Sequence, residues 1–157
     1  MVDWTHDGDA DPGPMRLSTA DARARLRAHD HGVLATVHRR RGVDAVPVTY
    51  AVAGEDLGIP VDTVKAKRST RLQRERNLEA DPRATLLVDH WDGADWCRLW
   101  WVRAELVWQP HPPAEREAAL AALLVDRYPQ YADRPFARVL VLRVAAVTGW
   151  AAGAEDR

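Results

Sequence analysis

The sequence predicts a mostly β protein, a six-stranded antiparallel barrel with helices over its ends, and three observations lead to this. Six short segments carry apolar residues in strand-like runs, and most of them follow one another through turns. Three further segments have the residue pattern of helices. The 157 residues suffice to bury one core, and no internal repeat or linker divides them. We therefore expect one domain over 15–151, a disordered arm over 1–14 and a short tail over 152–157.

Local signals set the ends of these elements. Ser18 is the expected N-cap of the first helix, with Asp21 as its reciprocal partner and Gly32 as the stop. Asp81, which precedes a proline, should end the second helix. The third helix covers 114–128, with Leu120, Leu123, Leu124 and Tyr128 at helical spacing. The expected strands are 33–38, 43–53, 57–61, 83–90, 97–108 and 138–150.

Proline and glycine mark two places where a ligand could approach the sheet. Pro47 has no N–H to give to a neighbouring strand, so the strand over 43–53 should lie at an edge or border a ligand cleft. Gly58 and Pro60 keep one face of the strand over 57–61 slim, which would permit close approach by something flat.

Composition excludes several classes of protein. The net charge is -1, so there is no global basic field of the kind that non-specific nucleic-acid binding needs. The single cysteine, Cys97, excludes an intramolecular disulfide and a Cys-rich zinc site. No apolar run approaches the length of a membrane span, and the N-terminus has no apolar signal core. We expect a cytoplasmic protein with no nucleic-acid partner and no membrane span.

The densest positive charge lies between the third strand and the second helix. A helix N-terminus already favours anions, so Lys and Arg at this point indicate a seat for a phosphate or polycarboxylate. The alternative is a solvated helix face on which Glu75 and Glu79 balance part of the charge. The basic residues are Lys65, Lys67, Arg68, Arg71, Arg74 and Arg76.

No nucleophile motif, Walker phosphate loop or Gly-x-Gly-x-x-Gly is present. His29 and His31 flank Asp30 at a helix end, where we expect their side chains to diverge as capping or surface residues. His38 and His90 alone make an improbable metal site. We therefore expect no metal site, and the sequence identifies no catalytic residue.

The seven tryptophans are unusual for this length. Trp100 and Trp101 are adjacent on one expected strand, so they point to opposite faces of the sheet. One of them should lie in the core. The other should lie on a surface that accepts a second subunit or an aromatic ring.

The chain resembles the pyridoxamine 5'-phosphate oxidase-like (PPOX class) superfamily, whose fold is the FMN-binding split β-barrel. Within it, the sequence is most similar to the actinobacterial deazaflavin-dependent oxidoreductases, which use coenzyme F420. The resemblance covers about Leu17 to Trp150. It rests on an ordered series of short motifs: Gly32–Val37, Val46–Tyr50, Lys65–Arg68, Asn77–Leu78, Asp81–Val88, Trp101–Ala104 and Val147–Trp150.

This resemblance implies a homodimer of split barrels with two cofactor sites at the interface. It places the flavin or deazaflavin ring against Pro47, Val48, Thr49 and Tyr50. It places the phosphate tail on Lys65, Lys67, Arg68 and Ser69. Trp101 and Arg103 would reach the cofactor from the second subunit.

The implied function is an oxidoreductase in which coenzyme F420 passes hydride to or from a small organic substrate. Tyr50 is the only candidate for a general acid, and a core aromatic is its alternative role. The extra arginines after Lys67 suit a long anionic tail. Residues 59–62 replace the Tyr-Thr-Asn-like run of the FMN oxidases, and the pyridoxal phosphate pocket residues cannot be placed. The alternatives are an FMN-binding oxidase or flavin reductase, a non-enzymatic cofactor-binding protein and, more distantly, a protein interaction module. A haem role lacks a well-supported axial histidine.

Overall fold

The computed structural model describes residues 15–62, 72–133 and 136–153. Three α-helices and seven β-strands occur in these residues, with short 3-10 turns at Trp96–Arg98 and Pro129–Tyr131. The elements run in the order α1 (Thr19–Ala28), β1 (His31–His38), β2 (Gly42–Thr49), β3 (Ala51–Ala53), β4 (Asp56–Asp62), α2 (Gln73–Ala80), β5 (Arg83–His90), β6 (Trp100–Trp108), α3 (Ala114–Arg127) and β7 (Phe136–Ala151).

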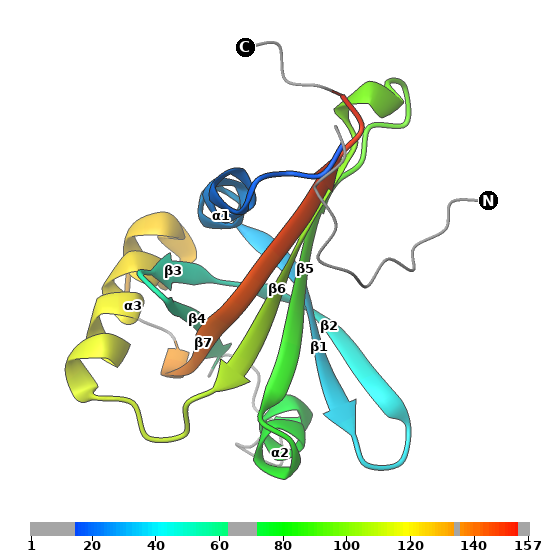
Figure 1. Cartoon of the computed structure of the whole chain (residues 1–157). Helices are drawn as coiled ribbons and strands as arrows, with labels where there is room; N and C mark the ends of the chain where they lie inside the picture. The colour runs from blue at the N-terminus through cyan, green and yellow to red at the C-terminus, as the bar shows by residue number, and fades with distance from the viewer. Residues whose placement is uncertain (1–14, 63–71, 134–135, 154–157) are drawn as a thin grey trace.

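All seven strands belong to one antiparallel sheet in the order β2-β1-β5-β6-β7-β4-β3. β2 and β3 occupy the two ends of this order, yet only Tyr50 separates them along the chain. The sheet must therefore curl until its two edges adjoin, which gives the half-barrel in Figure 1. The predicted class, mostly β with flanking helices in a split barrel, is confirmed. The strand expected over 43–53 is divided at Tyr50, which makes seven strands instead of six.

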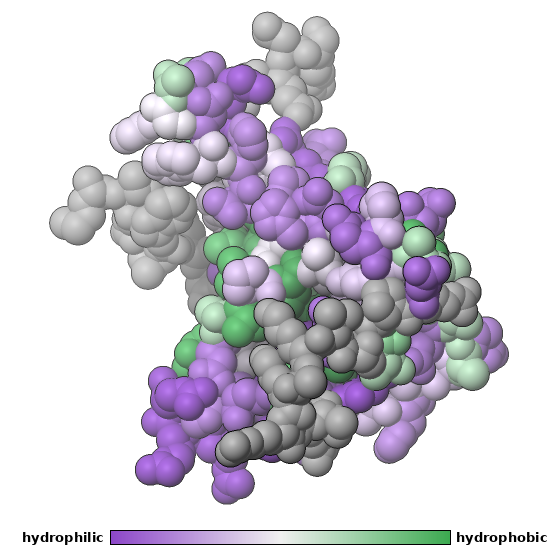
Figure 2. Space-filling model, turned by 180° about the vertical axis from the view of Figure 1, so that it is seen from behind, coloured by the Kyte–Doolittle hydropathy of each residue, from purple (hydrophilic) through white to green (hydrophobic). Residues whose placement is uncertain are grey.

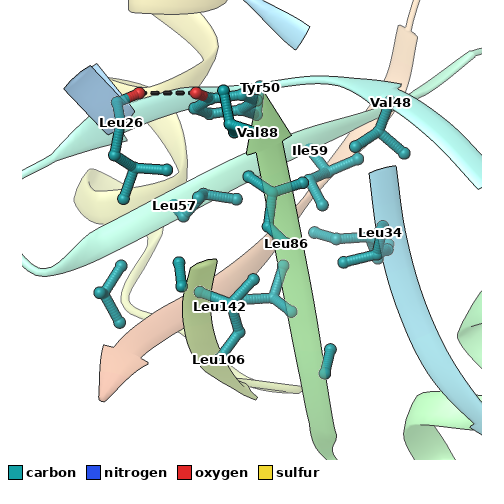
Figure 3. Packing of buried hydrophobic residues seen from close by; sticks show 14 of the residues in the cluster. Leu26, Leu34, Val48, Tyr50, Leu57, Ile59, Leu86, Val88, Leu106 and Leu142 are labelled. Atoms are coloured by element: carbon teal, nitrogen blue, oxygen red, sulfur yellow. Dashed lines mark hydrogen bonds between the residues drawn. The ribbon is translucent and has the colours of Figure 1, made fainter. Parts of the chain in front are cut away.

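Tyr50 holds this junction closed. Its side chain is buried, and its hydroxyl donates a hydrogen bond of 2.6 Å to the carbonyl oxygen of Leu26 in the last turn of α1 (Figure 3). The hydroxyl of Tyr128, the C-cap residue of α3, lies 2.9 Å from the carbonyl oxygen of Tyr50. Two helices thus fix the residue at which the chain passes from one edge of the sheet to the other.

The concave side of the sheet holds the main core. Alternate residues of the strands point into it, as the period of two requires, and Leu34, Leu86 and Leu142 are fully buried there (Figure 3). A second apolar cluster joins α3 to the outside of β3, β4 and β7. Its buried members are Ala51, Leu120, Leu124, Val139 and Val141.

The face of β4 that Gly58 and Pro60 keep free of large side chains packs against α3. The expectation that something flat could approach this face is therefore wrong. A Cβ atom added at Gly58 would lie 2.9 Å from both the Cβ atom of Leu120 and a methyl carbon of Val139. Leu123, which the helical spacing placed on the inner face of α3, is 41% exposed. The buried stripe of α3 is therefore narrower than the spacing predicts.

The end of α1 and the start of β6 also differ from the prediction. Ser18 caps α1 as expected, accepting from the backbone N–H of Asp21 at 3.1 Å. The helix, however, ends at Ala28, and Gly32 lies inside β1, where an added Cβ atom would approach the carbonyl oxygen of Leu87 to 2.6 Å. β6 begins only at Trp100, because a 3-10 turn occupies the three residues from Trp96. Among the described helices, none has the length and apolar character needed to cross a membrane.

Candidate functional site

The edge strand β2 carries the residues expected to face a cofactor ring. β2 is at one end of the strand order, which confirms the edge position that Pro47 predicts. Pro47 is exposed, whereas Val48 is buried on the concave side. Thr49 is half-buried, with its Oγ1 atom 3.2 Å from the hydroxyl of Tyr131. Tyr50 lies in the core.

Strand register brings Pro47 into one row with Arg103. Pro47 pairs with Val33 on β1, Val33 pairs with Leu87 on β5, and Leu87 pairs with Arg103 on β6. Paired residues of antiparallel strands share a face, so all four lie on the convex side of the sheet. Trp101 is two residues from Arg103 and shares this face. The sheet therefore gathers three predicted site residues from distant parts of the sequence.

This convex face exposes several apolar side chains. Val33 is 36% exposed, and Val37 and Leu87 are each 41% exposed. Two buried polar atoms here, Nε1 of Trp101 and Oγ1 of Thr148, have no hydrogen-bond partner in the described structure. Buried polar groups are normally paired, and large exposed apolar patches mark contact sites. On the face of the molecule that Figure 2 shows, apolar surface lies near the middle and hydrophilic surface lies around it.

The two adjacent tryptophans follow the prediction that they point to opposite faces. Trp100 packs against the main core, and the guanidinium of Arg25 lies 4.9 Å from its ring centroid. Trp101 is half-buried on the convex face.

The phosphate-binding residues expected from the sequence, Lys65, Lys67, Arg68 and Ser69, lie outside the described residues, as does Arg71. The structure does describe the residues on either side of this part of the sequence. β4 ends at Asp62, and α2 begins after Leu72. Lys65–Arg71 must therefore connect the end of β4 to the N-terminus of α2.

Arg74 departs from the expected role of a surface cation. It is half-buried, and its guanidinium donates to the carbonyl oxygen of Pro60 at 3.2 Å. Burial lowers the pKa of Arg74. The positive charge of α2 is therefore directed partly toward β4, which the one-dimensional charge pattern does not indicate.

A polar network fixes α2 beside the β1–β2 hairpin. The side-chain amide of Asn77 is buried and donates to Oγ1 of Thr36 and to Oδ2 of Asp44, both at 3.0 Å. The bond from Asn77 is the largest cause of the lowered pKa of Asp44, and Arg41 adds to it. The sequence alone does not indicate these partners of Asn77. As a result, the basic segment leads into a helix that is bonded to the edge strand β2.

The hydroxyl of Tyr50 is not directed toward a ligand. It donates to Leu26, and burial raises the pKa of Tyr50, so the phenol stays protonated at neutral pH. The buried side chain of Tyr50 agrees with its alternative role as a core aromatic residue. The described residues around β2 provide a surface and hydrogen-bonding groups for a ligand. They do not include a paired general acid and base.

The prediction that His29 and His31 diverge is wrong. The backbone of His29 is already extended (φ -81°, ψ 150°), so the two side chains emerge on the same side of the chain. Their ring centroids are 5.2 Å apart. Burial, followed by the neighbouring His31, lowers the pKa of His29.

Fold and site together define a split-barrel protein with exposed apolar side chains on its convex face and a basic stretch of sequence between β4 and α2. The chain matches the model of the family described as pyridoxamine 5'-phosphate oxidase over residues 18–151. It belongs to that family. A search of curated proteins finds no match.

Solved structures similar to the chain differ in what their names say they bind. A FAD-binding protein from Mesorhizobium loti has a TM-score of 0.64 at 17% identity, covering 85% of this chain and 93% of that one. An F420 reductase has a TM-score of 0.56 at 23% identity, covering 80% and 94%. The haem storage protein HutZ from Vibrio cholerae has a TM-score of 0.59 at 13% identity, covering 83% and 91%. At these identities the likeness establishes the fold and leaves the ligand open.

Proposed function

We propose that the protein is an oxidoreductase that uses coenzyme F420 to transfer hydride to or from a small organic substrate. The observation that carries this proposal is the arrangement at the edge of the sheet. α2, into which the basic segment leads, is bonded through Asn77 to Asp44 of edge strand β2. A flat ring on β2 and an anionic tail on Lys65, Lys67, Arg68 and Ser69 would then be neighbours.

The edge strand β2 and the basic residues before α2 have the chemistry that a deazaflavin or flavin requires. An edge strand has backbone groups that no second strand occupies, and these can bind the polar edge of a heterocycle beside Pro47, Val48 and Thr49. Lysine and arginine beside a helix N-terminus suit a phosphate. The bound ring would supply the hydride chemistry, while the protein orients the ring and substrate and excludes water.

The proposal includes a homodimer with the cofactor at the interface. A second copy would cover the apolar convex face and offer partners to Nε1 of Trp101 and Oγ1 of Thr148. Trp101 and Arg103 of that copy would then stand beside the cofactor. Pro47, Leu87 and Arg103 lie in one row across the sheet. In this proposal the same surface therefore forms both the dimer interface and part of the cofactor site.

The interface can be tested with two matched substitutions. Leu87 and Leu123 are both 41% exposed, the first on the convex face and the second on α3. Leu87→Glu is expected to give a monomer at micromolar concentration, because a carboxylate in an apolar interface costs several kcal/mol. Leu123→Glu should leave the assembly unchanged. Sedimentation velocity measures both, and a Leu87→Glu protein that stays dimeric would place the interface elsewhere.

The cofactor can be tested by fluorescence titration of the purified protein with oxidised F420, FMN and haem in parallel. We expect F420 to bind with a micromolar or lower dissociation constant and at least tenfold more tightly than FMN. Preference for FMN would instead support the oxidase or flavin reductase alternative. Binding of neither would remove the redox proposal while leaving the family assignment in place. Turnover assays on bound F420 then separate an enzyme from a non-enzymatic binder.

A further inference from the structure

Three consecutive residues with metal-binding side chains lie together between α1 and β1. His29 is the C-cap of α1, Asp30 follows it, and His31 is the first residue of β1. One ligand atom from each of the three, an imidazole nitrogen or a carboxylate oxygen, lies within 4.8 Å of the other two. The convergence follows from the extended backbone at His29.

The spacing is close to that of a bound ion. Imidazole and carboxylate ligands lie about 2.0–2.2 Å from zinc, so two ligand atoms in a tetrahedral site are about 3.4 Å apart. Small rotations of side chains bring atoms within 4.8 Å to this separation. Because His31 and Asp30 are exposed, they have room to make such rotations.

Asp30 and His31 already form a pair that suits metal binding. Nδ1 of His31 lies 2.6 Å from Oδ1 of Asp30. A carboxylate that accepts a hydrogen bond from one imidazole nitrogen orients the ring. The lone pair of Nε2 is then free to bind a metal ion, an arrangement common around metal-bound histidines. Asp30 can therefore act as the orienting group or, through its second oxygen, as a ligand.

The backbone beneath the three residues is held from α3. A guanidinium N–H of Arg127 donates to the carbonyl oxygens of Arg27 at 2.9 Å and Ala28 at 2.7 Å. The hydroxyl of Tyr128 bonds to the carbonyl oxygen of Asp30. At its other end, His31 is paired with Thr49 in the sheet. Only side chains remain to be ordered by an ion, so binding costs little conformational entropy.

We propose that His29, Asp30 and His31 bind one divalent transition-metal ion. Two imidazoles in a set of three favour zinc, nickel or copper over magnesium or calcium, which prefer oxygen ligands. Three protein ligands leave further coordination positions to water. Asp89 and His90 lie near His29, and three ligands at a largely exposed turn predict affinity in the micromolar range.

The test uses the full-length protein, first freed of metal by chelator, and calorimetric titration with zinc chloride. Co²⁺ absorption reports imidazole coordination independently. We expect one equivalent of zinc, with affinity reduced at least tenfold in His29→Gln and in His31→Gln. Asp30→Asn should lose about tenfold as well, because it removes both a carboxylate ligand and the group that orients the ring of His31. Thermal melting of each metal-free variant checks that the fold is retained.

Two further histidines serve as controls. His111→Gln removes an exposed histidine from the segment between β6 and α3 and should leave zinc affinity unchanged. His90→Gln removes a ring that stacks on Trp100 at 6.2 Å and contributes no atom to the cluster, so any effect should stay below threefold. No binding at millimolar zinc would overturn the proposal. Binding that survives both His29→Gln and His31→Gln would equally overturn it, since the ion would then lie elsewhere.

Discussion

Arg138→Leu is expected to lower the free energy of unfolding by about 3 kcal/mol, because it leaves a buried carboxylate without its cation. Glu75 is only 5% exposed, and Nε of Arg138 donates to its Oε1 at 3.0 Å. Breaking a buried pair from one side costs about 3–5 kcal/mol. We expect the lower end of this range because the side chain of Arg138 keeps 38% of its surface in solvent.

The position of Glu75 connects this pair to the candidate site. Oε2 of Glu75 also accepts the backbone N–H of Leu72 at 2.8 Å, which caps the first turn of α2. The same carboxylate therefore joins β7 to the residue at which the chain leaves the basic segment. Loss of Arg138 should weaken both stability and the placement of that segment.

Chemical denaturation with a constant m-value measures the change. Arg143 is exposed on the same strand, so Arg143→Leu is the matched control and should change the free energy by no more than about 0.5 kcal/mol. Adding Glu75→Leu to Arg138→Leu should restore part of the loss, because the buried carboxylate is removed together with its partner. The restoration is incomplete because the bond from the backbone N–H of Leu72 is lost with the carboxylate. A single-variant loss below about 1 kcal/mol would show that solvent already screens the pair.

Features encoded within a few residues were predictable from the sequence. The cap at Ser18, the edge position of β2 and the opposite directions of Trp100 and Trp101 each follow from local chemistry or from a period of two. The glycines of the two hairpin turns, Gly42 and Gly54, have the positive φ angles that such turns favour. These signals are enough to predict a curled antiparallel sheet.

Features set by distant partners were not predictable in this way. The division of the strand over 43–53 depends on Tyr50 meeting α1 and α3, which are far from it in sequence. Gly32 resembles a helix stop, but its reason is the carbonyl oxygen of Leu87 on the neighbouring strand. His29 and His31 converge because the helix ends earlier than Gly32 suggests. In each case a local pattern had two interpretations, and tertiary contacts selected one.

The same distinction between local signals and distant contacts applies to the candidate site. The charge of the basic segment and the edge position of Pro47 can be read from residue types alone. The row that joins Pro47 to Arg103 requires the register of four strands, and Asn77 acquires its role only from Thr36 and Asp44. Arg74 shows the limit of a charge count, since part of its charge is directed into the protein.

Lys65 and Lys67 are the only two lysines in the sequence, and replacing both by alanine is expected to weaken F420 binding at least a hundredfold. A hydrogen bond to a charged group contributes about 1.5–3 kcal/mol, so two lost contacts to a phosphate predict about 3–6 kcal/mol. The matched control is Arg39→Ala with Arg40→Ala, which removes two exposed charges from the β1–β2 turn. That control should change affinity by less than threefold at 0.15 M salt, since exposed charges that make no direct contact with the cofactor are largely screened there.

The same two lysines allow a measurement that needs no substitution. An amine-acetylating reagent can modify only Lys65, Lys67 and the chain's N-terminal amine, so mass spectrometry can follow each site separately. If both lysines bind the anionic tail, saturating F420 should slow their acetylation at least fivefold and leave the N-terminal amine unaffected. Inorganic phosphate at high concentration should protect the same pair more weakly. Equal modification rates with and without a bound cofactor would exclude both side chains from the tail site, and the phosphate would then have to rest on Arg68 and the backbone at the start of α2.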